Sequence, residues 1–385
     1  ICHMKVIIIG GGIGGLSLAI ALQRKNIPFE IYEATPVLQE AGAGIWLGGN
    51  AMNALDALGV GEIIKQKSNR LGKVFIKSQS GKVLQTVDCD VLEKKYGNAT
   101  YGIHRATLQL TLAACLNQTI NTGHRLSSIR QMDDKVEAVF ENGNVAVGDI
   151  IVGADGIRSV VREQYVTKAN YRYSGQTCWR AIIDTQLPPD EFSVGAEVWG
   201  NKGGLRASYT QLGGNQVYFW TTMKMAAGIQ VKNEDALTLI QKELSPFSGY
   251  MQQIIRMIQP ERLIHSDLFD MQPIKKWYHN RIVLLGDAAH ATTPNLGQGA
   301  SQAIEDAWVL ADNIAKYDYT NAFANYQQKR ITRATKVVNT SYQLAQLTNL
   351  GGPVFSTIKS ALLTLTPDTL ARKQFDFLYN VKFED

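Results

Sequence analysis

The strongest restriction on the fold is a glycine-rich run, GGGIGG from Gly10 to Gly15, that directly follows the apolar residues 6–9. A strand that enters a GxGxxG turn and continues as a helix begins a βαβ unit that binds a dinucleotide. The first glycine permits the tight turn, the second lets the backbone approach a pyrophosphate, and the third brings the helix close to the strand. A helix through residues 16–22 and a strand at 29–32 complete the unit, so we expect a Rossmann-like domain.

The carboxylate at the end of the second strand restricts which nucleotide can bind. Glu33 lies eighteen residues after Gly15, where a carboxylate accepts hydrogen bonds from an adenosine ribose and disfavours the 2′-phosphate of NADP. A plain turn between strand and helix, without a ligand, is the alternative.

A second glycine-rich segment runs from Gly286 to Ala300 and follows an expected buried strand at 281–285. Asp287 would lie at the carboxyl end of this strand, where it can bind the ribityl hydroxyls of a flavin. The sequence Gly297-Gln298-Gly299 would open a helix whose positive end favours a reduced, anionic flavin. Asp287 as a simple helix N-cap is the alternative. Together the two segments indicate FAD.

Between these segments the pattern changes to short strands with glycine-rich turns, from Tyr171 to about Tyr218. This pattern predicts a sheet of hairpins. Expected strands at 74–76 and 83–87 form a hairpin around Ser80-Gly81, and expected helices span 50–58, 107–116, 234–244, 248–258, 298–315 and 319–347.

The expected fold class is α/β, with a Rossmann-like FAD-binding domain interrupted by a mainly antiparallel β-sheet substrate domain and followed by C-terminal helices. The FAD-binding domain comprises residues 1–70, 101–170 and 265–345, the substrate domain 71–100 and 171–264, and the C-terminal helical segment 346–385.

Composition excludes several other classes of function. The net charge of +5 is spread over scattered Lys and Arg residues, which argues against a nucleic-acid surface. The four cysteines show neither metal-ligand nor disulfide-framework spacing, so we expect no metal and a cytoplasmic location. The apolar stretch 344–365 is broken by Gly351-Gly352-Pro353 and carries Lys359, which argues against stable membrane insertion.

Three motifs in order resemble the group A flavoprotein monooxygenases of the para-hydroxybenzoate hydroxylase fold. They are the turn at 10–15, the sequence GADGIRS from Gly153 to Ser159, and Gly286-Asp287 with Pro294 and 297–299. The resemblance implies that NADH or NADPH reduces FAD and that dioxygen forms a flavin C4a-hydroperoxide, which hydroxylates an aromatic or N-heterocyclic small molecule. Such enzymes lack a separate NAD(P)H domain, and the chain has no second GxGxxG unit.

The resemblance also implies roles for individual residues. Asp155 has a mixed structural and cofactor role, with a plain Asp155-Gly156 turn as the alternative, and Arg105 neutralises the pyrophosphate unless it is a solvated surface arginine. Gly49-Asn50 stands where relatives often have Pro-Asn, a change that affects the stiffness of the loop lining the flavin. The expected cofactor-binding residues are Gly10, Gly12, Gly14, Gly15, Glu33, Ala34, Trp46, Arg105, Leu126, Asp155, Asp287, Pro294, Gly297, Gln298, Gly299 and Ala300.

The substrate-side candidates are Arg206 and Tyr218, on neighbouring expected strands. A cation beside an ionisable ring OH or NH lowers its pKa and makes the ring a better nucleophile. A surface arginine and a half-buried sheet tyrosine are the alternative. The pair resembles that of FAD-dependent urate hydroxylases, and tetracycline-inactivating monooxygenases are a second family with this fold.

His290, the aromatic residues near the expected site and the class of function each have more than one interpretation. His290 beside a flavin is expected to have a structural rather than a catalytic role. Trp46, Trp179 and Trp220 form an aromatic wall with Tyr218 or else belong to the sheet core. A flavin dehydrogenase or oxidase, and a flavin-binding regulator without turnover, are the competing classes, and we expect a monomer or a homodimer.

Overall fold

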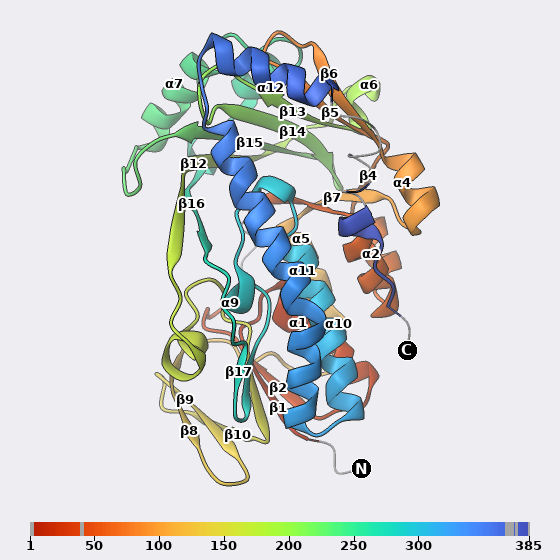
Figure 1. Cartoon of the computed structure of the whole chain (residues 1–385), viewed down its shortest axis with the longest axis vertical. Helices are drawn as coiled ribbons and strands as arrows, with labels where there is room; N and C mark the ends of the chain where they lie inside the picture. The colour runs from red at the N-terminus through yellow and green to blue at the C-terminus, as the bar shows by residue number, and fades with distance from the viewer. Residues whose placement is uncertain (1–3, 39–41, 366–372, 374–375, 384–385) are drawn as a thin grey trace.

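The computed structural model describes residues 4–38, 42–365, 373 and 376–383. Figure 1 shows a parallel sheet at one end of the molecule and a larger sheet at the other, with the long helix α11 (Tyr319–Thr348) running between them. The expected fold class is confirmed.

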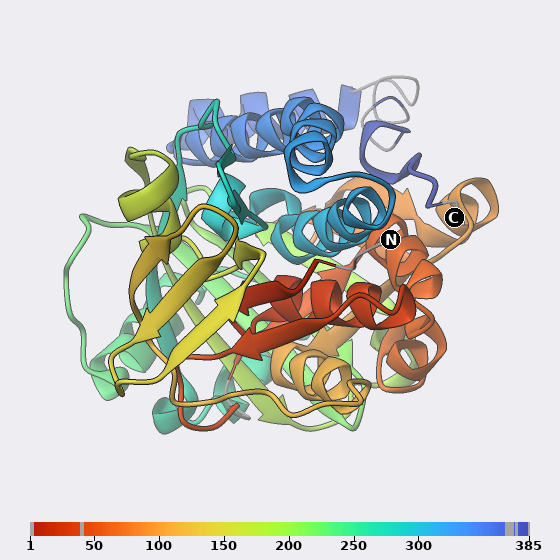
Figure 2. The ribbon, with the colours of Figure 1, turned by 90° about the horizontal axis from the view of Figure 1, so that it is seen from below.

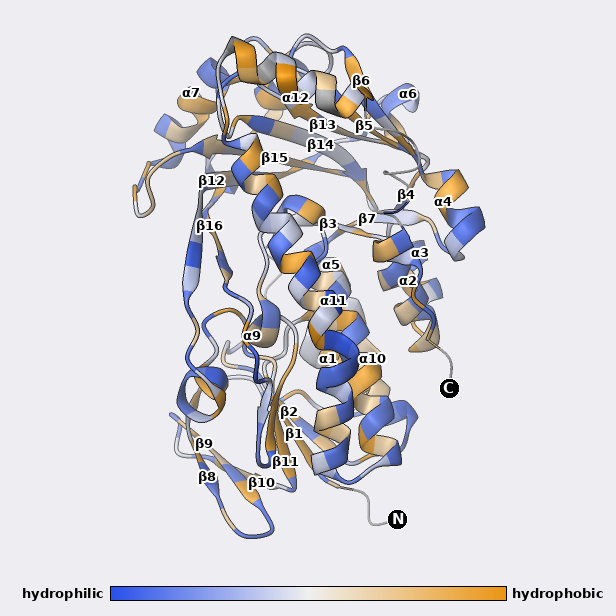
Figure 3. Ribbon diagram, viewed as in Figure 1, coloured by the Kyte–Doolittle hydropathy of each residue, from blue (hydrophilic) through white to orange (hydrophobic). Residues whose placement is uncertain are grey.

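The parallel sheet has the strand order β17-β18-β11-β1-β2. Its strands are β1 (Val6–Ile9), β2 (Phe29–Tyr32), β11 (Ile150–Gly153), β18 (Ile282–Leu284) and β17 (Tyr278–His279), of which only β17 pairs antiparallel. β1, β11 and β18 are completely buried, which is why they read as uninterrupted apolar runs. Figure 3 labels β1 and β11 among them. In register, Ile9 lies beside Gly153 and Gly153 beside Leu284. Three motifs that are far apart in sequence therefore leave the same edge of one sheet.

Helices pack around this sheet and carry the glycine-rich segments. α1 (Ile13–Arg24) follows the first turn and packs against α10 (Gly299–Lys316), which in turn packs against α2 (Gly49–Ala57) and α11. The other helices on this side are α3 (Gly61–Gln66), α4 (Cys89–Tyr96), α5 (Arg105–Ala114) and the short α9 (Asp287–His290).

The second sheet has seven strands in the order β16-β12-β15-β14-β13-β5-β6. They are β16 (Ile264–Met271), β12 (Tyr171–Asp184), β15 (Gln216–Lys224), β14 (Arg206–Leu212), β13 (Val194–Trp199), β5 (Lys73–Ser78) and β6 (Val83–Asp88). All pairs are antiparallel except β13 with β5. β16 extends this sheet beyond residue 264, where the expected substrate segment ends.

One face of this sheet packs on α7 (Asn233–Glu243) and α8 (Met251–Met257). The residues on that face alternate along each strand with residues of the opposite face, because successive side chains of a strand point to opposite sides. Trp179, Ala181 and Ile183 of β12 belong to the helix-covered core, whereas Cys178 and Arg180 face the other way, towards the parallel-sheet half.

Two small sheets complete the structure, and the sequence did not predict them. One consists of β8 (Leu126–Gln131), β9 (Val136–Phe140) and β10 (Val145–Gly148), and the other of β3 (Gly44–Leu47), β7 (Thr100–His104) and β4 (Asn69–Leu71). In Figure 2 the first of them (yellow) lies beside the parallel sheet (red), where Tyr32 stacks on Phe140 at a ring separation of 4.5 Å.

Short helical turns and one further helix remain. They are α6 (Pro189–Phe192), a π-helix (Arg162–Val166), 3-10 helices at Pro260–Arg262 and Pro294–Leu296, and α12 (Pro353–Leu365). Within the described residues, none of the helices combines the length and apolar character that crossing a bilayer requires.

Candidate active site

A cavity of about 440 Å³ lies between the glycine-rich segments and the open face of the seven-stranded sheet. The expected site residues that line it are Gly12, Gly14, Trp46, Arg105, Asp287, Pro294, Gly297, Gly299, Ala300, Arg206 and Tyr218. The remaining expected residues, Gly10, Gly15, Glu33, Ala34, Leu126, Asp155 and Gln298, are not part of its wall. The structure thus brings the cofactor motifs and the substrate-side pair to one space.

The glycines of the first turn differ in what surrounds them. Gly10 has a φ of +115°, and a Cβ there would lie 2.2 Å from the carbonyl oxygen of Ala154. A Cβ on Gly15 would lie 2.0 Å from the Gly10 oxygen, whereas a Cβ on Gly12 would meet nothing within 4 Å. Gly10 and Gly15 therefore allow tight packing, and Gly12, the N-cap of α1, leaves open space at a helix N-terminus. This is the arrangement that a pyrophosphate requires.

Glu33 and Asp155 hold the loops that surround this turn. The Glu33 carboxylate accepts hydrogen bonds from the backbone N–H groups of Gly11, at 2.7 Å, and Thr35, at 2.8 Å. Asp155 accepts hydrogen bonds from the Ser159 hydroxyl and from the backbone N–H of Val161. Burial raises the pKa of Asp155, and these hydrogen bonds act in the opposite direction. These contacts supply the structural part of the role expected for Asp155.

Asp287 and Arg105 place opposite charges in the cavity wall. Asp287 begins α9 and makes no capping bond, because the N-cap is Gly286 with a φ of +62°. Its side chain is exposed to the cavity. The surrounding protein desolvates the carboxylate and raises its pKa, against the opposing charges of His290 and Arg105. Arg105 is exposed at the start of α5.

Gln298 lies behind the cavity wall and ties the second glycine segment to α2. Its side-chain oxygen accepts a hydrogen bond from Asn50 Nδ2 at 3.0 Å and from Gln302 Nε2 at 3.1 Å. Asn50 is buried and also donates to Glu305 at 2.6 Å. An added Cβ on Gly49 would lie 2.8 Å from the Asn98 carbonyl oxygen. The loop after Trp46 is thus anchored through Asn50 to α10.

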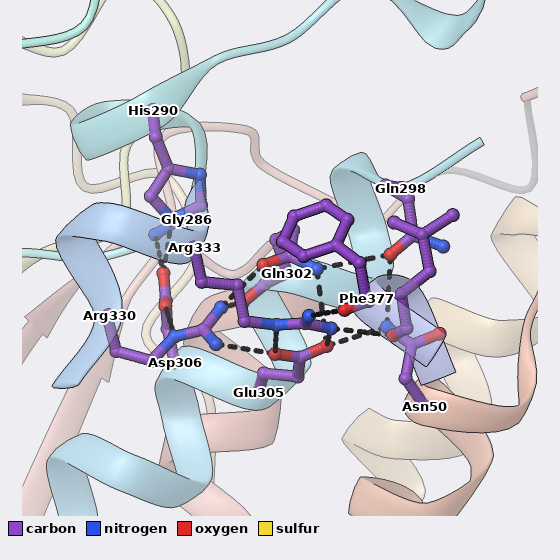
Figure 4. A network of polar contacts seen from close by, with 11 residues as sticks. Asn50, Gly286, His290, Gln298, Gln302, Glu305, Asp306, Arg330, Arg333 and Phe377 are labelled. Atoms are coloured by element: carbon purple, nitrogen blue, oxygen red, sulfur yellow. Dashed lines mark hydrogen bonds and ion pairs between the residues drawn. The ribbon is translucent and has the colours of Figure 1, made fainter. Parts of the chain in front are cut away.

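A buried network of charges continues from these residues to Gly286 (Figure 4). Asp306 accepts hydrogen bonds from the Gly286 N–H at 3.0 Å, from His290 Nε2 at 2.5 Å and from Arg330 Nε at 2.6 Å. Burial alone would raise the pKa of Asp306, but the His290 and Arg330 charges hold it at about 2. His290 is 4% exposed, and its hydrogen bond to Asp306 gives it a structural position behind the cavity wall rather than in it.

The same network reaches the C-terminal segment 376–383. Arg333 binds both carboxylate oxygens of Glu305 and donates to the backbone carbonyls of Phe377 and Leu378. Tyr379 packs against Gly48, where an added Cβ would lie 2.5 Å from its ring. These contacts place the C-terminal segment directly behind Gly48, at the end of the strand β3 that contains Trp46.

Arg206 and Tyr218 both lie on the open face of the seven-stranded sheet. Arg206 is 3% and Tyr218 8% exposed, so neither is a surface residue. Arg206 forms an ion pair with Glu197 at 2.9 Å, and its guanidinium carbon lies 5.4 Å from the centre of the Trp220 ring. Burial raises the pKa of Tyr218, and the neighbouring Arg180 opposes that effect. The phenol is therefore a neutral hydrogen-bond donor at physiological pH.

Sequence reasoning missed two charged residues in this wall, Arg180 and Glu197. Each stands in a strand whose alternate residues are apolar, as Arg180 does between Trp179 and Ala181. That alternation was a usable signal for a second face that is lined by polar groups. Trp46, Trp220 and Tyr218 belong to the cavity wall, whereas Trp179 is core beneath the helices and does not belong to an aromatic wall.

Residues 3–200 and 259–341 match the family described as an FAD binding domain. The chain is 34% identical over 346 residues to aurachin C monooxygenase/isomerase of Stigmatella aurantiaca, covering 89% of each protein. It is 31% identical over 363 residues to 3-hydroxybenzoate 6-hydroxylase of Polaromonas naphthalenivorans, covering 91% of this chain and 89% of that protein. The chain belongs to the family of FAD-dependent aromatic hydroxylases.

A solved structure of this hydroxylase family agrees with the arrangement of the two halves. HpxO of Klebsiella pneumoniae, complexed with FAD and uric acid, superposes with a TM-score of 0.89 at 25% identity, covering 98% of this chain and 97% of that one. The expected resemblance to flavoprotein hydroxylases and the expectation of FAD are thereby confirmed.

The residues of the present chain fit FAD in three places. Gly12 leaves open space at the N-terminus of α1, which suits a pyrophosphate. Asp287 lines the cavity with a carboxylate to which none of the described side chains donates a hydrogen bond, which suits the ribityl hydroxyls. Gly297, with a φ of +62° and nothing within 4 Å of an added Cβ, precedes α10 and leaves room for a ring system beside the helix start.

Proposed function

We propose that the protein is a monooxygenase that uses NADH or NADPH and dioxygen to hydroxylate an aromatic or N-heterocyclic small molecule. The balanced reaction consumes the ring compound, NAD(P)H, a proton and O₂, and yields the hydroxylated ring, NAD(P)⁺ and water. The observation that supports it is the continuous cavity from the glycine turn and Asp287 to Arg206 and Tyr218.

FAD, when bound, takes up the reducing equivalents and activates dioxygen. The chain's own residues have the tasks of binding, orientation and water exclusion. Arg206 would stabilise negative charge on a ring oxygen or nitrogen, and Tyr218 would orient the ring by donating a hydrogen bond. The sheet and the residues 292–297 line the cavity from two sides, and they would enclose a bound ring and keep water from the reacting atoms.

Substrate-stimulated consumption of NAD(P)H by the FAD-loaded protein tests this function. The compounds to screen are hydroxybenzoates, quinolones, uric acid and tetracycline, each with NADH and with NADPH. Reactions under ¹⁸O₂ should yield a product that carries one ¹⁸O atom. Oxidised product without ¹⁸O would indicate the dehydrogenase or oxidase alternative, and FAD binding without turnover of any compound would support a regulator.

A further inference from the structure

Four side chains form one straight row across the open face of the seven-stranded sheet. In register, Arg180 pairs with Trp220, Trp220 with Ser208, and Ser208 with Glu197. The row thus crosses β12, β15, β14 and β13, with a cation at one end and a carboxylate at the other. Three strand spacings of about 4.8 Å separate the end backbones by about 14 Å. Because Arg180 and Glu197 both line the cavity, the space between their tips suits a small one- or two-ring molecule.

The carboxylate at one end has an unused acceptor. Glu197 Oε1 accepts hydrogen bonds from Trp199 Nε1 at 2.7 Å and from Arg206 Nη1 at 2.9 Å. Among the described residues none donates to Oε2, and the Glu197 side chain keeps 19% of its surface exposed. The two donors fix the carboxylate in place, so that Oε2 is available to a ligand N–H or O–H group.

The cation at the other end is not neutralised. Arg180 donates to the Ser266 hydroxyl at 2.8 Å and lies beside the Tyr218 hydroxyl. No described carboxylate lies within ion-pair distance of it, whereas Arg206 already has Glu197 as its counter-ion. This end therefore offers donors to a ring oxygen, and Trp220 between the two ends offers an aromatic surface.

We propose that the cavity selects a ring without a carboxylate that presents an acceptor oxygen to Arg180 and an N–H or O–H donor to Glu197. This inference rests on the proposed function and specifies its substrate class, a neutral vinylogous amide or a phenol of comparable length. Arg206, the cation at this end, is already paired with Glu197. A ligand carboxylate near the donor would therefore lack a counter-ion of its own there and would be repelled by Glu197.

Three related probes test the inference on the wild-type holoenzyme: 4(1H)-quinolone, its N-methyl derivative and its 2-carboxylate. Dissociation constants come from the perturbation of flavin absorbance. We expect the N–H compound to bind about tenfold or more tightly than either derivative, because a hydrogen bond to a charged group has that effect on affinity.

Two substitutions of Glu197 distinguish the effect of its hydrogen-bond acceptor from the effect of its negative charge. Glu197→Ala removes the acceptor and should abolish the discrimination against the N-methyl compound. Glu197→Gln keeps an acceptor oxygen but removes the charge, and should improve binding of the 2-carboxylate about tenfold. The matched controls are Glu191→Gln and Glu191→Ala, since Glu191 accepts a hydrogen bond from the Tyr209 hydroxyl outside the cavity wall. FAD content and melting temperature establish that each variant folds.

The outcomes separate this inference from the proposed function. Equal or tighter binding of the 2-carboxylate by wild type, no binding of 4(1H)-quinolone, or unchanged discrimination in folded Glu197 variants would overturn the inference. Incorporation of ¹⁸O into any bound ring tests the proposed function separately. Preferential binding of the N–H compound without ¹⁸O incorporation would support the selectivity and contradict the monooxygenase.

Discussion

Single residues in and behind the cavity wall have separable tasks, and the glycines of the first turn show this most clearly. Gly15 is needed for packing, because its Cα approaches the Gly10 carbonyl, whereas Gly12 faces open space. Two glycines three residues apart therefore have different tasks: Gly15 serves stability, and Gly12 serves ligand binding. The substitution of each by alanine distinguishes the two.

We expect Gly15→Ala to lower the free energy of unfolding of the apo-protein by about 1–3 kcal/mol, because an added Cβ overpacks the turn. Gly12→Ala should leave this quantity within about 0.5 kcal/mol and weaken FAD binding, since its methyl group enters the pyrophosphate space. Urea unfolding and FAD titration measure the two effects. Equal loss of stability in both variants would contradict the division of tasks.

Tyr218 provides a second prediction at this scale. Since burial raises its pKa, the phenol stays protonated throughout the usual assay range and contributes no titration of its own there. Tyr218→Phe should lower kcat/KM about tenfold through the lost hydrogen bond, by a factor that is constant from pH 6 to 9. Tyr317→Phe, at an exposed tyrosine, is the control. A factor that changes with pH would indicate that Tyr218 ionises.

At the scale of elements, α10 and α11 hold the second glycine segment through buried charges. Asp306 on α10 accepts a hydrogen bond from the Gly286 N–H, and Arg330 on α11 neutralises the Asp306 carboxylate. The position of the Asp287 turn is therefore set by two helices that lie behind it. Because unfolding exposes Asp306 to water, its lowered pKa is linked to stability.

We expect this linkage to appear on acidification. The pKa of Asp306 is lowered from 3.8 in its ordinary state to about 2 in the folded protein, which corresponds to about 2 kcal/mol of stability. This contribution is complete above about pH 4 and is lost as the pH falls towards 2. Asp306→Asn should reduce stability at pH 7 and flatten its decline below pH 4, in urea unfolding at each pH. Asp134→Asn, at an exposed position, should reproduce the wild-type curve.

Elements were predictable from the sequence where one local pattern determines them. The buried strands of the parallel sheet, the hairpin at 73–88 and helices α10 and α11 all follow from periodicity and turn residues. The row from Arg180 to Glu197 was not predictable, since it depends on the register of four strands, and a slip of one residue would turn every side chain to the other face. The buried Asn50–Glu305 bond joins residues 255 positions apart, for which no local signal exists.

At the scale of the whole molecule, segments from all parts of the chain meet at the cavity. Residues from the stretches 12–14, 44–46, 178–222 and 285–303 contribute to its wall, and the segment 376–383 supports it from behind. The contacts of Arg333 with Glu305 and with the carbonyls of Phe377 and Leu378 connect this support to the buried network.

Arg333→Met tests that connection. It should speed hydrogen exchange in residues 376–383 and 44–52 and weaken FAD binding several-fold, because the segment behind the flavin-lining loop loses its two charge-assisted hydrogen bonds. Lys329→Met on the exposed face of the same helix is the control. Faster exchange at 376–383 alone, with unchanged FAD affinity, would show that the C-terminal segment does not support the loop.

The late position of residues 377–379 has a consequence for synthesis. Domains generally fold as units while the nascent chain emerges from the ribosome. Here residues 377–379, which lie behind the end of β3, leave the ribosome about ninety residues after Asp287. Contacts between residues so distant in sequence also form slowly. We therefore expect a ribosome-bound chain that has emerged only as far as α11 to hold FAD weakly. Full cofactor loading would then follow the emergence of residues 377–379.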